Sequence, residues 1–208
     1  MPSLISIKPY PFKSITSVLV LTLLASISPL ALANNALKNQ LVPPAYTLKN
    51  ERTVSYNNGR AQLSRYERAD GRNTGLHGEH VSLLIDPQGQ LKGYIKKDQS
   101  QLQGNLPSQE EARTIAVAFV RQYAPSLLNG FRHDGVSRET EALQRGTATV
   151  QIPYLRVKMR SSDDLWFWVF VGNDRQAMAF ERDLGWDYLR FRRSTEQWLL
   201  DAQRPHNS

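Results

Sequence analysis

The feature that most constrains this fold is a continuous apolar run at residues 165–171, with the sequence Leu-Trp-Phe-Trp-Val-Phe-Val. The run is too short for a typical helix, and its aromatic and β-branched side chains favour a strand. It therefore predicts a strand in the centre of a sheet. Because side chains alternate along a strand, Trp166 and Trp168 should share one face, with Phe167 and Val169 on the other.

Turn signals divide other β-rich stretches of the chain into antiparallel pairs. Asn58-Gly59 is typical of a hairpin, since both residue types tolerate a positive φ. Asp86-Pro87-Gln88-Gly89 and Gly172-Asn173-Asp174 also have the composition of turns. The further predicted strands are residues 52–56, 60–68, 81–85, 91–95, 154–159 and 176–183. Residues 127–146 show no regular pattern and are interpreted as irregular.

The clearest helix signal in the chain begins at Ser108. Ser108 and Glu111 match a capping box, in which each side chain accepts a hydrogen bond from a backbone amide of the first turn. Pro125 ends this helix. The apolar residues that follow the cap recur at helical spacing and form one stripe: Ala112, Ile115, Ala116, Phe119, Val120 and Tyr123. A second helix is predicted within residues 187–203.

This order of elements indicates an α+β fold, an antiparallel sheet with two helices packed on one face. The single domain should span residues 51–203, after an extended lead-in at residues 34–50 that carries Pro43-Pro44. Residues 204–208 are interpreted as a flexible tail. The hairpin at residues 81–95 with its following helix resembles the later hairpin and helix, but the identity between them is too low to indicate a repeat.

The first 33 residues have the build of a secretory signal. Lys8 and Lys13 give a positive start, an apolar stretch follows, and Ala31-Leu32-Ala33 matches the small-x-small pattern of signal peptidase sites. Cleavage after Ala33 would start the mature protein at Asn34 and place it in the periplasm or outside the cell. The alternative is an uncleaved anchor, which needs roughly 20 apolar residues to span a membrane. The apolar run here is shorter, so the mature chain should not span one.

Charge and cysteine content narrow the possible partners. The chain has 26 Lys and Arg against 19 Asp and Glu and no cysteine, so it forms neither disulfides nor a lipid-modified cysteine. Arginine binds carboxylates and phosphates with two parallel hydrogen bonds, which points to an anionic surface as one partner. Many arginines stand beside acids, as Arg182 does, and a solvated mixed-charge surface is the alternative. Nucleic acid is not an expected partner.

Candidate catalytic and metal-binding residues are few. The sequence has no Gly-x-Ser-x-Gly elbow and no phosphate-binding glycine loop. His77 and His80 are weak metal candidates, because a spacing of three on a strand points the two rings to opposite faces. They are interpreted as exposed loop histidines, and no metal or cofactor is predicted. Glu181 and Asp183 would share a strand face as an acid–base pair, or would pair with neighbouring arginines.

The tryptophans of the apolar run are the main candidates for binding a partner. Helices cover one face of the sheet, and the smaller Phe167 and Val169 fit a helix-packed layer better than two tryptophans do. Trp166 and Trp168 are therefore assigned to the less covered face, where large aromatic side chains mark a binding surface. The predicted binding residues are Trp166, Trp168, Arg182, Arg192 and Arg193.

The start of the first helix carries a family resemblance. Leu106-Pro107-Ser108-Gln109-Glu110-Glu111-Ala112, with Ile115-Ala116, resembles the helix signature of PepSY-type domains, and the resemblance covers about residues 104–183. Residues 171–175 depart from it, because they lack the Asp-x-x-Thr-Gly turn of that family. The resemblance implies an exported, non-catalytic module, and some such modules restrain secreted peptidases.

Three functions stay open at this point. The first is a non-enzymatic binding module, a PepSY-like modulator of another envelope or secreted protein such as a peptidase. The second is an envelope adaptor that binds an anionic polymer or lipid surface through its arginines. The third is an enzyme of unrecognised type.

Overall fold

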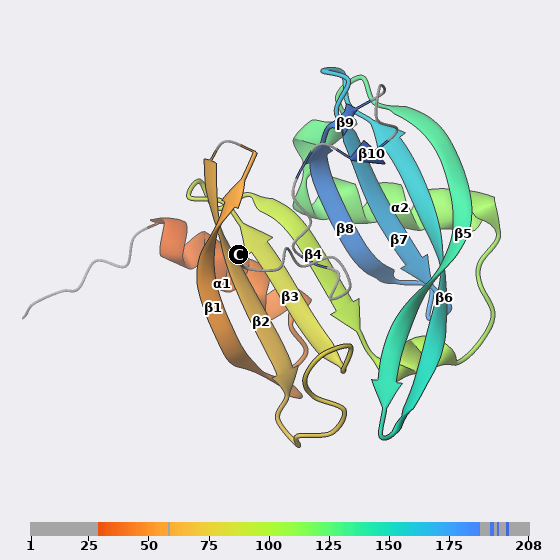
Figure 1. Cartoon of the computed structure of the whole chain (residues 1–208). Coiled ribbons are helices and arrows are strands. Elements are labelled where there is room, and N and C mark those ends of the chain that lie inside the picture. Colours follow the sequence, from red (N-terminus) through yellow and green to blue (C-terminus); the bar gives the residue numbers. More distant parts are fainter. Residues whose placement is uncertain (1–28, 58, 188–191, 194, 196–198, 200–208) are drawn as a thin grey trace, which may run out of the picture.

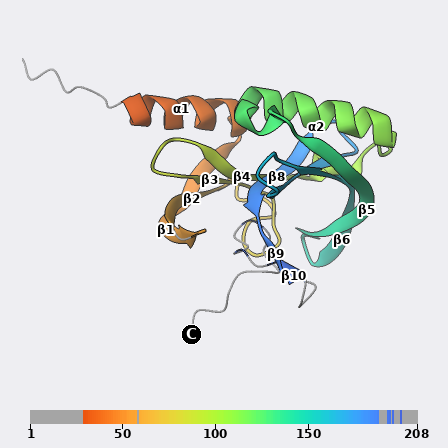
Figure 2. The same cartoon turned by 90° about the horizontal axis from the view of Figure 1, so that it is seen from above.

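Eight strands form one continuous antiparallel sheet, and two helices lie on one of its faces (Figure 1 and Figure 2). The computed structural model describes residues 29–57, 59–187, 192–193, 195 and 199. The helices are α1 (Pro29–Leu41) and α2 (Gln109–Tyr123). The strands are β1 (Tyr46–Tyr56), β2 (Gly59–Arg68), β3 (His80–Ile85), β4 (Leu91–Lys97), β5 (Arg132–Arg145), β6 (Ala148–Arg160), β7 (Trp166–Gly172) and β8 (Ala177–Leu184). No helix among the described residues is long and apolar enough to cross a membrane.

The chain is built from two halves with the same order of elements, a helix followed by a four-stranded meander. The first half is α1 with β1–β4, and the second is α2 with β5–β8. The strand order β1-β2-β3-β4-β8-β7-β6-β5 is palindromic. It is joined at its centre by the antiparallel pair of β4 and β8, where Tyr94 stands opposite Phe180. Each half therefore places its last strand at this seam and its first strand at an edge.

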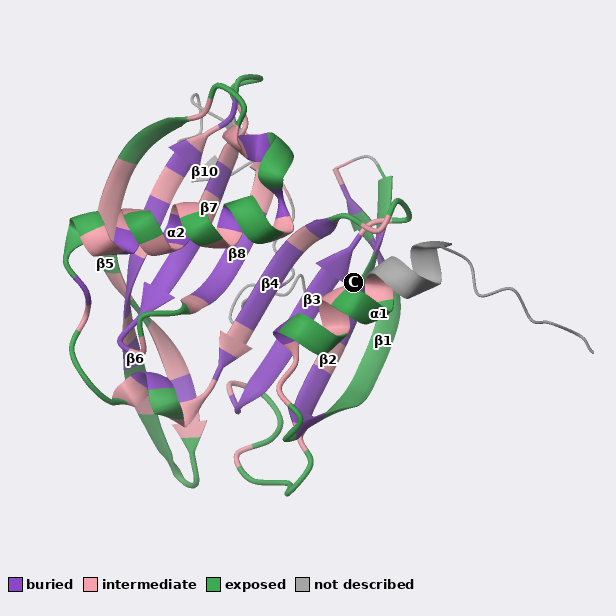
Figure 3. Ribbon diagram, turned by 180° about the vertical axis from the view of Figure 1, so that it is seen from behind, coloured by how far each residue is buried: buried purple, intermediate pink, exposed green. Residues whose placement is uncertain are grey.

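The main core lies between the helices and the sheet. Ala112, Ala116 and Val120 of α2 are fully buried and pack with Phe167 and Val169 of β7. Figure 3 shows α2 lying across β7 and β8, with buried stretches in these elements. Trp166 and Trp168 are only half-buried. The predicted alternation of this strand is confirmed, and the α+β sheet with both helices on one face is the observed fold.

The face away from the helices has a second apolar cluster and is curled by two cross-connections. At one end, the Tyr56 hydroxyl donates to the Arg182 carbonyl at 2.5 Å, and the Asn57 amide donates to the Asp183 carbonyl at 2.8 Å. At the other end, the backbone amide of Gln144 in the β5–β6 hairpin donates to the His77 carbonyl at 2.8 Å. These contacts hold both outer hairpins over the same face. The cluster between them includes Leu63, Ile95, Ile152, Phe170, Met178 and Leu199.

The predicted strands and the helix at Ser108 are confirmed, with one detail changed at the helix start. Ser108 Oγ accepts a hydrogen bond from the Glu111 amide at 3.1 Å. The reciprocal half of the capping box is absent between these two residues. The Glu111 carboxylate instead accepts from Arg175 Nε at 2.9 Å, because the β7–β8 turn brings that guanidinium to the helix start.

Three segments differ from the sequence-based prediction. Residues 34–41, expected to be extended, are helical because Leu37 and Leu41, one turn apart, both pack on the main core. Residues 132–145, expected to be irregular, form the edge strand β5, whose largely polar sequence hides its alternation. The helix within residues 187–203 is wrong over its described start. There Trp186–Asp187 (β9) pairs with Arg192–Arg193 (β10) as extended chain. The second helix of the fold is therefore α1.

The rest of the predicted second helix lies outside the described residues, as do most of the signal peptide and the tail at residues 204–208. The predicted cleavage position after Ala33 falls inside α1, which begins at Pro29. The two similar hairpin-plus-helix segments are divided differently in the structure than in the sequence comparison. In the structure each repeated unit begins with its helix and ends with its hairpin.

A candidate binding strip of arginine and tryptophan

Two neighbouring strands of the second half carry large polar and aromatic side chains on the face away from the helices. On β6 and β7, Arg160 stands opposite Trp166 and Lys158 opposite Trp168. The residues between them on β6, Val157 and Met159, are fully buried on the helix side. We call the set Arg156, Lys158, Arg160, Trp166 and Trp168 the Arg–Trp strip.

Each tryptophan of the strip lies beneath an arginine. The Arg160 guanidinium carbon is 4.2 Å from the Trp166 ring centroid, and that of Arg156 is 4.6 Å from the Trp168 centroid. Cation–π contacts of this kind contribute about 0.5–2 kcal/mol, and more as they lose water. The Arg156 and Arg160 side chains are 24% and 20% exposed. The indoles therefore act as platforms that fix two partly exposed guanidinium groups.

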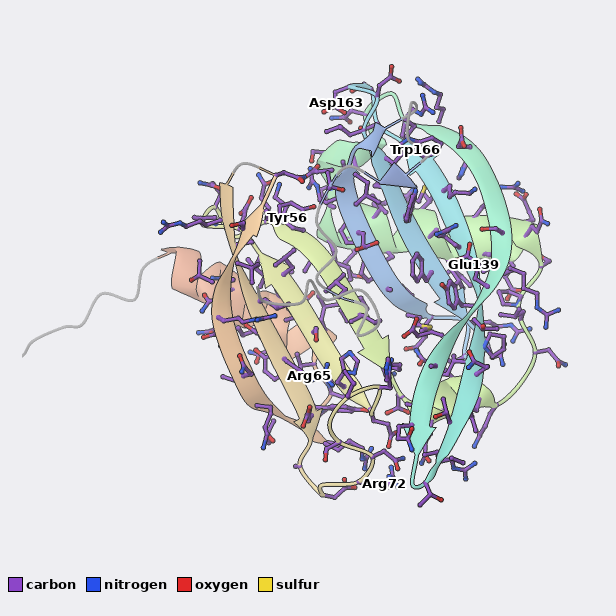
Figure 4. All side chains as sticks on the ribbon, in the orientation of Figure 1. Tyr56, Arg65, Arg72, Glu139, Asp163 and Trp166 are labelled. Carbon is purple, nitrogen blue, oxygen red and sulfur yellow. The ribbon has the colours of Figure 1, made fainter. Side chains whose placement is uncertain are left out.

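Glu139 of β5 fixes one end of the strip. Its carboxylate accepts from Arg156 at 2.5 Å, from the Ser137 hydroxyl at 2.9 Å and from the Tyr154 hydroxyl at 3.2 Å. Burial and the neighbouring Glu139 carboxylate raise the pKa of Tyr154 well above its usual value, so this phenol stays a donor. Figure 4 shows Glu139 and Trp166 in the view from the side opposite the helices.

The other end of the strip is looser. Asp164, in the turn before β7, is paired with Arg132 and lies 3.7 Å from Arg160. The Asp164 side chain is 70% exposed, and exposed ion pairs contribute little because water competes for both groups. Asp164 therefore holds Arg160 less firmly than Glu139 holds Arg156.

Lys158 stands between the two stacked arginines. It lies opposite Gly135 of β5, whose missing side chain leaves room over the lysine stem. Among the described residues, Lys158 has no acidic partner within salt-bridge distance. Three cations thus follow one another at alternate positions of β6.

The structure brings together only part of the predicted binding set. Trp166 and Trp168 lie in the strip. Arg182 does not: its neighbour Glu181 is the register partner of Trp168, so Arg182 points to the opposite face, where its Nε donates to Asp183 at 3.0 Å. Arg192 and Arg193 form β10, and their side chains lie outside the described structure.

The predicted metal and acid–base candidates occupy structural positions. His80 was expected to be exposed but is completely buried on β3, with Nδ1 2.8 Å from the Gly78 carbonyl oxygen. That expectation was wrong because the strand begins one residue earlier than its apolar run. Within the described part of the chain, no three His, Cys, Asp or Glu residues are grouped to hold a metal. Asp183 is paired with Lys92 at 2.9 Å and with Arg182, as the ion-pair alternative expected.

The arginines of the strip were missed by the sequence analysis. Arg156-x-Lys158 places two cations on one face of the strand predicted at residues 154–159, and Arg160 continues the spacing just beyond it. Trp166-x-Trp168 places two indoles on one face of the next strand. That pair of patterns was the available signal. These two patterns do not reveal the register of β6 against β7, which places the cations beside the indoles.

A groove between the two helices is the other notable surface feature. It has a volume of about 330 Å³ and lies over the seam of the two halves. Phe119 forms its wall and stacks on Tyr94 at a centroid distance of 5.7 Å. Its remaining lining is mixed: Gln40, Leu41, Pro43, Lys96, Ile115, Ala118, Gln122, Tyr123, Gln176 and Ala177.

The fold and the strip define an α+β sheet protein with a cationic, aromatic-backed face. No model of a known protein family matches the chain, and no curated protein matches it either. The resemblance to PepSY-type domains stays a prediction that rests on the helix start at Ser108.

Proposed function

We propose that this protein is a non-enzymatic binding module that works outside the cytoplasm and holds an anionic partner on the Arg–Trp strip. The observation that carries the proposal is the pair of guanidinium groups fixed over Trp166 and Trp168. A fixed guanidinium loses less side-chain entropy when it binds an anion than a free one does. Arginine and tryptophan are also the residues on which binding energy most often concentrates.

The polar groups considered for catalysis support a binding role over an enzymatic one. Asp183 is neutralised by Lys92 and Arg182, and His80 is buried against the Gly78 carbonyl. The export signal and the PepSY-type resemblance both imply a place in the envelope or outside the cell. Of the predicted partners, an acidic protein surface and an anionic polymer both fit the charge of the strip.

The test compares two variants with the same change in charge. Arg156→Gln with Arg160→Gln removes the stacked cations, and Arg113→Gln with Arg121→Gln removes two arginines from α2 on the opposite side of the sheet. Each protein is immobilised and incubated with an envelope extract of its own host, and the captured material is quantified by mass spectrometry and by phosphate and uronate assays. We expect capture to fall at least tenfold for the strip variant and to stay near wild type for the α2 variant. Equal capture by both variants would contradict the proposal.

A further inference from the structure

We propose that the anion is a linear polyanion that lies along β6 and contacts Arg156, Lys158 and Arg160 in succession. This inference rests on the proposed function and specifies its ligand. The chemistry that the strip recognises is a chain of carboxylate or phosphate groups.

The arrangement of the cations carries this inference. Arg156, Lys158 and Arg160 occupy alternate positions of one strand, so their Cα atoms are about 7 Å apart and the row spans about 14 Å. Arg132 of β5 lies beside the Arg160 end as its register partner. One small anion reaches one or two of these groups. A chain of repeated charges meets the whole row.

The acidic groups beside the row determine at which cation a polyanion gains most. Glu139 neutralises Arg156 and is itself held by Ser137 and Tyr154, so it stays in place. Glu181 is the register partner of Trp168 and is buried. Asp164 is the exposed acid, and it sits at the Arg160 end. A polyanion therefore gains most at Lys158, which has no acidic partner within salt-bridge distance among the described residues.

The stacked arginines also define how the ligand is recognised. Each indole is already stacked with a guanidinium group, so one face of each ring is occupied and the strip presents cations there. Recognition then depends on charge more than on stacking against a sugar ring or an aromatic group. Charge recognition at a partly exposed site weakens as salt screens it.

The experiment measures binding of the exported protein to polygalacturonate and to inorganic polyphosphate, with dextran as the neutral control. Monomeric galacturonate and inorganic phosphate are the single-charge controls. We expect at least one polyanion to bind, with a slope of log K against log salt of about −2 when three charges of a single-stranded polyanion are neutralised. The polymer that binds identifies carboxylate or phosphate as the source. Binding of neither polymer, or equal binding of dextran or of the monomers, would overturn the inference.

Variants locate the site on the protein. Replacing Arg156, Lys158 and Arg160 together with Gln should weaken polyanion binding roughly a hundredfold, from about 1 kcal/mol per cation. The charge-matched control replaces Arg113, Arg121 and Lys49 with Gln, away from the strip, and should bind as wild type. If the triple strip variant fails to fold, Lys158→Gln leaves both stacks intact and should weaken binding about fivefold. Unchanged binding by the folded strip variant overturns the inference.

The two proposals fail in different ways. If capture from the envelope extract depends on the strip but neither polymer binds, the binding function stands and the polyanion is wrong. If neither capture nor polymer binding responds to the strip variants, both proposals are wrong.

Discussion

The two halves of the molecule share one architecture and differ in the sheet face that points away from the helices. In the first half that face is apolar and covered, with Val54 and Leu63 buried and Leu199 of the C-terminal region packed over Gly93. In the second half the same apolar cluster continues over Ile152, Phe170 and Met178. The rest of β6 and β7 there carries the Arg–Trp strip, which is half-buried and charged. The same order of elements thus carries a buried apolar patch in both halves and the Arg–Trp strip in the second half alone. The fold positions the site, while the side chains on one face decide what it does.

The largest expected effect comes from the two faces of β7. Phe167→Ala should lower the free energy of unfolding by about 3–5 kcal/mol, because it leaves a cavity in the main core. Trp166→Ala should cost about 1–2 kcal/mol, since a half-buried ring and its cation–π contact are lost. Urea unfolding of both variants tests the contrast. Similar losses for the two variants would mean that the strip is part of the core and not a binding face.

A middle-sized effect is expected at the covered face of the first half. A Cβ atom at Gly93 would lie only 2.7 Å from Leu199 Cδ1. Gly93→Ala should therefore cost about 1–2 kcal/mol through overpacking. Leu199→Ala in the same chain should remove most of that added cost, because the two residues are in contact. A double-mutant cycle by urea unfolding measures the coupling, and strictly additive losses would show that Leu199 does not hold this face.

The smallest effect is expected on the pH dependence of stability, through one tyrosine in each half. Burial and a carboxylate partner raise the pKa of Tyr46, which donates to Asp98, and of Tyr154, which donates to Glu139. A raised pKa in the folded state contributes stability that is complete below about pH 10 and is lost as the pH rises further. Tyr46→Phe and Tyr154→Phe should each flatten the loss of stability above pH 10. Urea midpoints at pH 8 and pH 11 measure this, and an unchanged slope in both variants would contradict it.

The sequence predicts pairing between neighbouring segments of the chain better than pairing between distant ones. Alternation in residues 165–171 predicted both faces of β7, and the turn residues predicted the hairpins, because these features depend on neighbours in the chain. The seam between β4 and β8 joins Tyr94 to Phe180, and no local pattern encodes such a pairing. Predicting the Arg–Trp strip also requires the register of β6 against β7. β5 escaped notice because an edge strand with polar residues on its outer face lacks a strong apolar period.

The palindromic strand order also determines which strands lie at the free edges of the sheet, where another copy could pair. Placing β4 and β8 at the seam leaves β1 and β5 as the free edges, which are templates for aggregation when they are long and regular. Both edges are interrupted. The register shifts between Leu48 and Asn50 in β1, and between His133 and Gly135 in β5. Charged side chains such as Lys49 and Arg138 line the same strands. Both free edges therefore carry irregularities and charges that disfavour pairing with the edge of another copy.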